Sequence, residues 1–449
     1  MQRKISPVAQ KAVAHYIAES ERLNQACDNE SLKQIREQAQ ALLKQQGFPT
    51  QRDENWQYTR LTNFVQKHFE VKPASKITSE QLHKFMPDFA VTKVVFVDGW
   101  FNESLSDDLA ALPKGVSFES LQDTFDIAGD TSALFSSESE ITKEPFGVLN
   151  SLLLADGFYL QLSANAHLEL PLFVLNIQTE GQHMSNLRNR IELADNAELT
   201  LIERYVTLET STQDNDSMAC TNVVTEVNLA KHTRFKQVVM QEQDDNAFYF
   251  NNQYIYQDDS SSCMSFYGSM GSQLSRHQNH IFMNGEHIES QQNSACLAKD
   301  KQTVDSRTDT QHNDVWGNSQ QLHKYVLTDH AVGVFNGMIR VDQKAQKTDG
   351  QMDNKNLLLS DTAKMDTKPQ LEIYADDVKC SHGSASGQID KNQIFYLQAR
   401  GIRRADAIKM ITHAFLLEPV EVINNAAIRQ WVTARLSAGL ASVQKKVRE

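Results

Sequence analysis

Short β-type segments dominate the middle of the chain. Between about residues 159 and 397, runs rich in Val, Ile, Tyr, Phe and Thr alternate with joints of Asp, Asn, Ser, Gly and Gln. Asn222–Val227, Phe235–Met240 and Val332–Phe335 are examples. These runs are about four to seven residues long and recur about every 12–20 residues, which is typical of strands. The pattern predicts a sandwich, a barrel or a β-solenoid.

Three features of this region favour a β-helix over a pair of sandwiches, which stays the alternative. The run of strands is long for one sandwich. Asn, Gln, Ser and Thr are abundant in and beside the strands, where stacked coils form side-chain ladders. Proline is nearly absent between Pro171 and Pro369, so parallel ladders keep their donors.

The N-terminal region, residues 1–90, has helical patterns. Ser6 and Pro7 fit an N-cap and a first helical residue. Ser31–Gln34 has the capping-box form and predicts the start of a second helix, which Gly47 ends. Residues 91–158 form a mixed lead-in. There a strand at Val94–Val97 runs into a turn, and short helices are expected at 117–125 and 146–155.

The C-terminal region, residues 398–449, is predicted to be helical. An apolar stripe at helical spacing is interrupted by Pro419, and a second helix is expected from about 420 to 443. The stripe consists of Ile402, Ala405, Ile408, Ile411 and Phe415. The expected organisation is therefore a β core at 159–397 between two helical regions.

Composition narrows the classes of partner. The formal net charge is −13, which disfavours nucleic-acid backbones and anionic membranes as partners. No segment reaches the roughly 18 apolar residues that span a bilayer, and no apolar signal core follows the first residues. The five cysteines are scattered without a C-x-x-C, which fits free thiols. We therefore expect a cytoplasmic protein without a prebuilt zinc site or four-cysteine cluster.

Few residue clusters suggest catalysis or metal binding. His277, His280 and His287 are the best-looking metal set, but residues three apart on a strand point to opposite faces. The acidic pairs Asp244–Asp245 and Asp258–Asp259, like Asp376–Asp377, fall at apparent turns, where Asp is favoured for backbone reasons. A secreted-type carbohydrate-active β-helix enzyme is therefore a remote alternative.

Cys380 and His382 form the one dense constellation. Two residues apart on a strand, they project from the same face, and both side chains can ligate iron. From spacing alone, a buried cysteine and a hydrogen-bonded histidine is the favoured interpretation. Two ligands cannot hold a cluster, so a functional site here would need ligands from another chain.

The segment around this pair resembles the SufB/SufD family of iron–sulfur cluster assembly subunits. The similarity covers Gln370–Gly383, Gly387–Asp390 and Ile394–Ile402, with Asn356–Ser360 upstream and Trp56–Thr59 near the N-terminus. One departure is Ser384–Ser386, where the family has Ala-Thr. The Cys-Ser-His-Gly sequence and the lack of further clustered cysteines place the resemblance with the SufD branch rather than the SufB branch.

The resemblance implies a fold and partners. The fold would be a mostly β, right-handed parallel β-helix flanked by helical regions. The partners would be SufB, through the β-helix edge at Cys380 and His382, and the ABC-type ATPase SufC. The ATPase would dock on residues 400–422, including Arg400, Gly401, Ile402, Ala405, Ile408, Ile411 and Phe415.

The resemblance also implies a non-catalytic scaffold. No cofactor would be tightly bound in the isolated chain. Iron or an iron–sulfur cluster would be held transiently, shared between His382 and SufB. A homodimer of the isolated chain is plausible through its exposed edge. A SufB-type scaffold that carries the cluster itself is the alternative.

Overall fold

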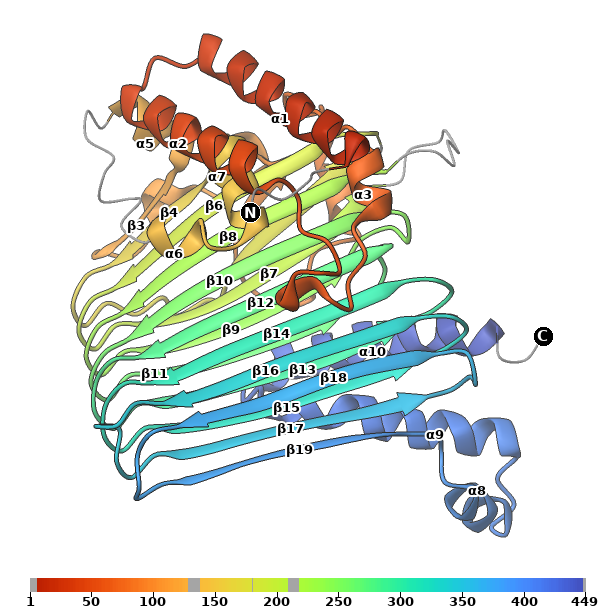
Figure 1. The fold of residues 1–449 in the computed structure, drawn as a ribbon. Coiled ribbons are helices and arrows are strands. Elements are labelled where there is room, and N and C mark those ends of the chain that lie inside the picture. Colours follow the sequence, from red (N-terminus) through yellow and green to blue (C-terminus); the bar gives the residue numbers. More distant parts are fainter. Residues whose placement is uncertain (1–5, 128–137, 180, 209–217, 447–449) are drawn as a thin grey trace.

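A parallel β-helix forms the centre of the molecule, as predicted (Figure 1). The computed structural model describes residues 6–127, 138–179, 181–208 and 218–446. The strands are β1 (Thr92–Val97), β2 (Trp100–Phe101), β3 (Val116–Ser120), β4 (Asp156–Leu162), β5 (Leu172–Thr179), β6 (Met184–Leu193), β7 (Glu198–Leu208), β8 (Cys220–Leu229), β9 (Arg234–Glu242), β10 (Phe248–Gln257), β11 (Ser262–Ser269), β12 (Leu274–Met283), β13 (Glu289–Ala298), β14 (Thr303–His312), β15 (Asn318–Leu327), β16 (Val332–Val341), β17 (Asp349–Leu358), β18 (Lys364–Ile373) and β19 (Lys379–Gly387).

Successive strands alternate between two sheets. Within the described residues, one sheet has the order β19-β17-β15-β13-β11-β9-β7-β5-β1-β2, and the other β18-β16-β14-β12-β10-β8-β6-β4-β3. Each strand from β5 to β19 therefore pairs in parallel with the strand two places along the chain, as β10 does with β8 and β12. The antiparallel pairs β1–β2 and β3–β4 occur only where the coil begins.

The strands are longer than the sequence pattern indicated. Most span 8–11 residues, because the rows of apolar residues end before the hydrogen-bonded ladder does.

One corner of the coil repeats the same backbone conformation in successive turns. Asn196, His232, Ser260, His287, Trp316 and Lys347 all have positive φ there. Each donates its N–H to a carbonyl one turn onward, as Trp316 does to Gln346 (3.0 Å). Asn is favoured in this conformation, whereas Trp is an unusual occupant.

The N-terminal helices cover the beginning of the β-helix (Figure 1). They are α1 (Pro7–Gln25), α2 (Glu30–Gln46), α3 (Thr62–Gln66), α4 (Ser79–His83), α5 (Leu121–Ile127), α6 (Glu138–Ile141) and α7 (Pro145–Leu152). Phe146 of α7 stacks on Phe250 of β10, with ring centroids 3.5 Å apart. The apolar faces of α1, α2, α3 and α7 are thus buried against the outer face of the nine-stranded sheet, whereas Leu82 of α4 packs on the ten-stranded sheet.

The predicted ends of the first two helices are confirmed at Ser6 and Gly47 but not at Ser31. Ser6 caps α1 through a bond from the Ala9 N–H, and Pro7 is its first residue, as expected. The predicted capping role of Ser31 is wrong, because Asn29 is the N-cap of α2 and accepts from the Leu32 N–H at 2.9 Å. Gly47, with φ of 63°, ends α2 as predicted.

The lead-in also differs in one place. The turn after β1 forms at Asp98 and Gly99, as predicted. The expected helix at 117–125 is instead strand β3 followed by α5, because Val116–Ser120 pairs with β4. β1 itself joins the ten-stranded sheet beside β5, so the lead-in contributes to the coil.

The Trp56–Thr59 motif docks on the outside of the β-helix. The Arg276 guanidinium lies 3.9 Å from the centroid of the Trp56 ring and is ion-paired with Asp305. The hydroxyl of Thr59 donates to the same carboxylate at 2.5 Å, and all four side chains are buried. The motif thus fastens the N-terminal segment to β12 and β14.

Three C-terminal helices follow the last strand. They are α8 (Lys391–Gln398), α9 (Arg404–Leu417) and α10 (Ala426–Lys446). α10 begins later than the predicted residue 420, because Pro419 sits in a 3-10 turn at Glu418–Val422. Leu416, Trp431 and Leu436 pack against the outer face of the ten-stranded sheet. No helix in the described part of the chain is long and apolar enough to cross a membrane.

Candidate partner-binding surfaces

The β-helix ends without a cap. β18 and β19 are the edge strands of the two sheets, and every residue in both is at least partly exposed. In the preceding turn, the inward-facing residues of β16 and β17, such as Phe335 and Met352, are buried. The last turn therefore presents its inner face and two unpaired strand edges, which we call the open end.

Cys380 and His382 lie on the inner face of the open end. In the register of β17 and β19, Cys380 is opposite Gly350 and His382 is opposite Met352. Met352 belongs to the core inside the coil, so the side chains of its register partners project the same way. His382 is exposed, and Cys380 is half-buried. The structure thus brings both side chains to one face, as their spacing predicts.

The thiol of Cys380 is not activated in the free chain. Burial raises its pKa, while a hydrogen bond from the Gly350 backbone acts in the opposite direction. A protonated thiol is a poor nucleophile and a poor metal ligand. In the described residues, no group of three or more His, Cys, Asp or Glu side chains is placed to hold a metal ion.

The three histidines near residue 280 do not converge. His277 points into the coil and stacks on Tyr267, with ring centroids 4.1 Å apart. His280 points outward and stacks on Tyr254. His287 lies at the corner beside Trp316. The opposite faces expected for His277 and His280 are confirmed.

The acidic pairs lie at turns and are engaged in local contacts. Asp245 is ion-paired with Lys299 at 2.6 Å, and Asp259 with Lys231 at 2.7 Å. Asp377 is ion-paired with Lys347. These contacts join different turns of the coil, so the three aspartates have a structural role.

The predicted ATPase-docking stripe is divided between two grooves. Ala405 and Ile408 line a mainly apolar groove of about 530 Å³ between α9, the start of α8 and Leu358–Asp361. Ile411 and Phe415 line a second groove of about 670 Å³, between α8 and α9. There the ammonium group of Lys324 lies 4.3 Å from the centroid of the Phe415 ring. A side chain of the β-helix therefore already covers one face of the Phe415 ring.

The remaining docking candidates lie around the turn between α8 and α9. Gly401 has φ of 83° and forms the turn, and Ile402 beside it is half-buried. The guanidinium of the exposed Arg400 stacks on Tyr396, 3.4 Å from the ring centroid. This turn therefore presents a cation above an aromatic ring.

The most exposed apolar side chains of this region are not among the docking residues named from the sequence. Phe395 is 71% exposed, Tyr396 56% and Met410 52%. The signal was present in the sequence, because successive helical residues lie about 100° apart. Since Ile394 is buried in α8, the two aromatic residues that follow it cannot both face the protein.

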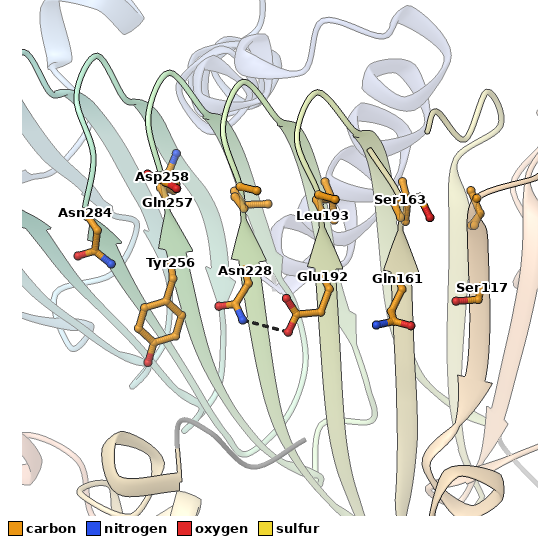
Figure 2. Close-up of a pocket in the computed structure, with 16 residues that line it drawn as sticks. Ser117, Gln161, Ser163, Glu192, Leu193, Asn228, Tyr256, Gln257, Asp258 and Asn284 are labelled. Carbon is orange, nitrogen blue, oxygen red and sulfur yellow. Dashed lines mark hydrogen bonds between the residues drawn. The ribbon is translucent and has the colours of Figure 1, made fainter. Parts of the chain in front are cut away.

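A separate groove of about 630 Å³ crosses the outer face of the nine-stranded sheet (Figure 2). Gln161, Glu192, Asn228 and Tyr256 follow one another on adjacent strands along it. Glu192 is ion-paired with Arg190 at 2.6 Å and accepts from Asn228 at 3.0 Å. The groove runs from β3 to the residues just after β12, away from β18 at the open end, and the C-terminal helices cover the other sheet.

Comparison with known proteins identifies the family. The SufBD protein N-terminal region matches residues 8–174, and the SufBD core domain of SUF-system FeS cluster assembly matches residues 175–415. The chain is 34% identical to the iron–sulfur cluster assembly protein SufD of Escherichia coli, over 91% of this chain and 92% of that one.

More distant relatives align over similar spans. An iron–sulfur cluster assembly SufBD family protein of Synechocystis is 28% identical, over 89% of this chain and 90% of its own length. The chloroplastic protein ABCI7 of Arabidopsis thaliana is 26% identical, over 89% and 84%. Together with the parallel β-helix between two helical regions, these matches establish that the chain belongs to the SufBD family, as a SufD-type protein of iron–sulfur cluster assembly.

Proposed function

We propose that the chain is the non-catalytic scaffold subunit of a SUF complex. It pairs with a SufB-type chain at the open end and holds the ATPase SufC on its C-terminal helices, supporting iron acquisition and cluster assembly. The observation that carries this proposal is the uncapped last turn, with Cys380 and His382 on its exposed inner face. Unpaired strand edges favour the addition of strands from a partner.

Iron, or the nascent cluster, is the substrate at this surface. Imidazole nitrogen and thiolate sulfur both ligate iron, and SufB side chains would complete the set. Because burial raises the pKa of Cys380, His382 is the primary ligand in our proposal. Coordination would displace the thiol proton and recruit Cys380 second.

The C-terminal helices are the proposed ATPase site. The exposed Phe395, Tyr396 and Met410 extend the surface predicted from residues 400–422. Large exposed apolar side chains are the usual anchors of protein interfaces. ATP-driven dimerisation of two ATPase subunits would strain the contact with SufB and expose His382.

Other aspects of the proposal follow from charge and cysteine chemistry. The five cysteines are free thiols, which suits the reducing cytoplasm. The net charge of −13 argues against nucleic-acid and membrane partners. An isolated chain would use the same open end to form a homodimer.

Co-expression tests the partners. We expect the tagged chain to co-purify with SufB and SufC from the same organism as one defined complex on gel filtration. A folded chain that captures neither protein would refute the scaffold role.

The role of His382 is tested in that complex. His382→Ala should leave assembly intact and lower the iron or cluster content, whereas exchange of the exposed His167 for Ala should change neither. Equal cluster content in both variants would rule out the role. A stable cluster reconstituted on the isolated wild-type chain would favour a SufB-type role instead.

The docking surface is tested by charge insertion. Phe395→Asp should abolish ATPase binding without unfolding the chain, because Phe395 is mostly exposed. Ile408→Asp and Phe415→Asp should also abolish it. Ile408 is half-buried and Phe415 packs against the protein's own core, so the folding of these variants must be checked. Val8→Asp, at an exposed apolar residue of α1, is the matched control. ATPase binding by a folded Phe395→Asp variant would contradict this placement.

A further inference from the structure

The interior of the β-helix is polar along its middle turns. In the ten-stranded sheet, one inward-facing column runs through Leu201, Gln237, Ser265, Gln292, Gln321, Met352 and His382. Bonds across the coil fix the direction of its amides. Gln292 donates to the Thr310 hydroxyl at 2.7 Å, and Gln321 accepts from the Thr308 hydroxyl at 2.8 Å. Both threonines belong to β14 of the opposite sheet.

A second polar column faces the first. In the nine-stranded sheet, Thr225, Gln253, Asn279 and Thr308 lie in register. Gln253 and Asn279 are buried. Among the described residues, neither amide atom of Gln253 has a hydrogen-bond partner, nor does Asn279 Oδ1. Gln292 Oε1, from the first column, is also unpaired.

These atoms lie in two adjacent turns of the interior, formed by β10–β13, which we call the polar layer. Gln321 of β15 reaches Thr308 and Thr310 of β14, so one turn earlier Gln292 of β13 faces Asn279 of β12. Gln253 precedes Asn279 in the same column. The unpaired atoms therefore gather in the turns formed by β10–β13.

Ser265 is a short side chain in this part of the interior. It is the only short side chain between Gln237 and Gln321 in its column, and its hydroxyl donates to Gln237 at 3.4 Å. Because a serine lacks the amide group of its glutamine neighbours, we infer that space is left beside it. Space and several convergent polar atoms are the two conditions for a buried water.

Four unpaired buried atoms in one layer would strongly destabilise a dry core. We propose that the layer lined by Gln253, Ser265, Asn279 and Gln292 binds ordered water molecules inside the β-helix. The water satisfies the amide groups and fills the space beside Ser265. This hydration site is independent of the partners proposed above.

Magnetic relaxation dispersion of water oxygen-17, measured on the full chain, counts long-lived internal waters. The contribution of long-lived internal waters to the oxygen-17 relaxation, called the long-lived component, should be smaller in Asn279→Leu than in the wild type. It should be unchanged in Ile281→Leu, a volume-conserving exchange on the same inner face of β12. Equal components in the wild type and a folded Asn279→Leu variant would overturn the proposal.

Ser265→Gln provides a second test that does not remove a polar group. If water fills the space, the glutamine side chain replaces it, the protein keeps its Tm within a few degrees, and the long-lived component falls. A sharp loss of Tm would mean that the layer is closely packed and dry. Should either variant fail to fold, a high-resolution crystal structure of the wild type decides: density for water bonded to Asn279 Oδ1 supports the site, and its absence overturns it.

Discussion

Asp98 joins three segments of the chain through one buried carboxylate. It accepts from the Ser75 N–H at 3.0 Å, from the Thr179 N–H at 2.8 Å, and it contacts His183 Nε2 at 2.9 Å. Its positive φ of 52° places the side chain where β1 turns toward β2. The hydrogen bonds and the His183 partner outweigh burial and hold the pKa of Asp98 at about 2. A single residue thus fastens the linker after α3 to the first turn of the coil.

Asp98→Asn should destabilise the protein in a pH-dependent manner. Because the folded pKa lies below the ordinary value of 3.8, the ionised carboxylate stabilises the fold above about pH 4. This contribution, about 2 kcal/mol, is lost as the pH falls from 4 toward 2. In denaturant unfolding, the variant should be less stable than the wild type at pH 7, with a smaller difference at pH 3.5. Asp88→Asn, at an exposed aspartate, is the control. A difference in stability between Asp98→Asn and the wild type that does not depend on pH would contradict the low pKa of Asp98.

At the scale of elements, the Trp56–Thr59 segment acts as a strap across the coil. Besides the buried cluster with Arg276 and Asp305, Glu54 is ion-paired with Lys368 of β18 at 2.6 Å. The strap therefore reaches from β12 to the edge strand of the open end. This gives a physical reason for the sequence motif: its threonine and tryptophan complete a buried ion pair on the sheet.

Thr59→Val should loosen this strap. The exchange keeps the side-chain shape but leaves the buried Asp305 short of one donor, at a cost of about 1–3 kcal/mol. Hydrogen–deuterium exchange should increase in residues 50–60, while the strands stay protected. Arg60→Ala, at an exposed residue of the same segment, should have no such effect. Unchanged protection of the strap in Thr59→Val would show that the hydroxyl is dispensable.

Elements could be predicted from the sequence where local side-chain chemistry determines the structure. Val94–Val97 was found as a strand because its residues are apolar, and Ser6 and Gly47 were found because capping depends on local backbone geometry. The full length of strands such as Glu289–Ala298 was not predictable from hydrophobicity, since Gln292 and Ser294 face the interior.

The candidate site also has parts that could be predicted from the sequence and parts that depend on packing. Cys380 and His382 could be placed on one face by strand alternation, but only the register showed that this face is the inside of an uncapped coil. The apolar stripe from Ile402 to Phe415 was visible in the sequence. Its division between two grooves depends on how α9 packs against α8 and Lys324.

At the scale of the whole molecule, the interior buries histidines in their neutral form. Burial lowers the pKa of His277 and His323 to about 3 and that of His312 to about 4. His323 accepts or donates at Ser294 (2.8 Å), and His312 at Ser319 (2.8 Å), so each histidine links neighbouring segments inside the coil.

Stability should therefore decline in mild acid. The unfolded chain binds protons at these histidines near pH 6.5, whereas the folded chain does so only near pH 3–4. The stabilisation is complete above pH 6.5 and is lost as the pH falls below it, by about 2 kcal/mol per histidine at pH 5. His312→Gln should reduce the fall in Tm between pH 7 and 5, and His167→Gln, at an exposed site, should not. A Tm equal at pH 7 and 5 in the wild type would contradict this account.

Pro369 lies in the middle of β18, the outermost strand of the nine-stranded sheet. A proline has no N–H to donate, so this strand cannot offer a complete ladder to a further strand. Growth of the coil by successive addition of like chains is therefore interrupted at its first step. The end that we propose to bind one partner therefore resists open-ended stacking of like chains.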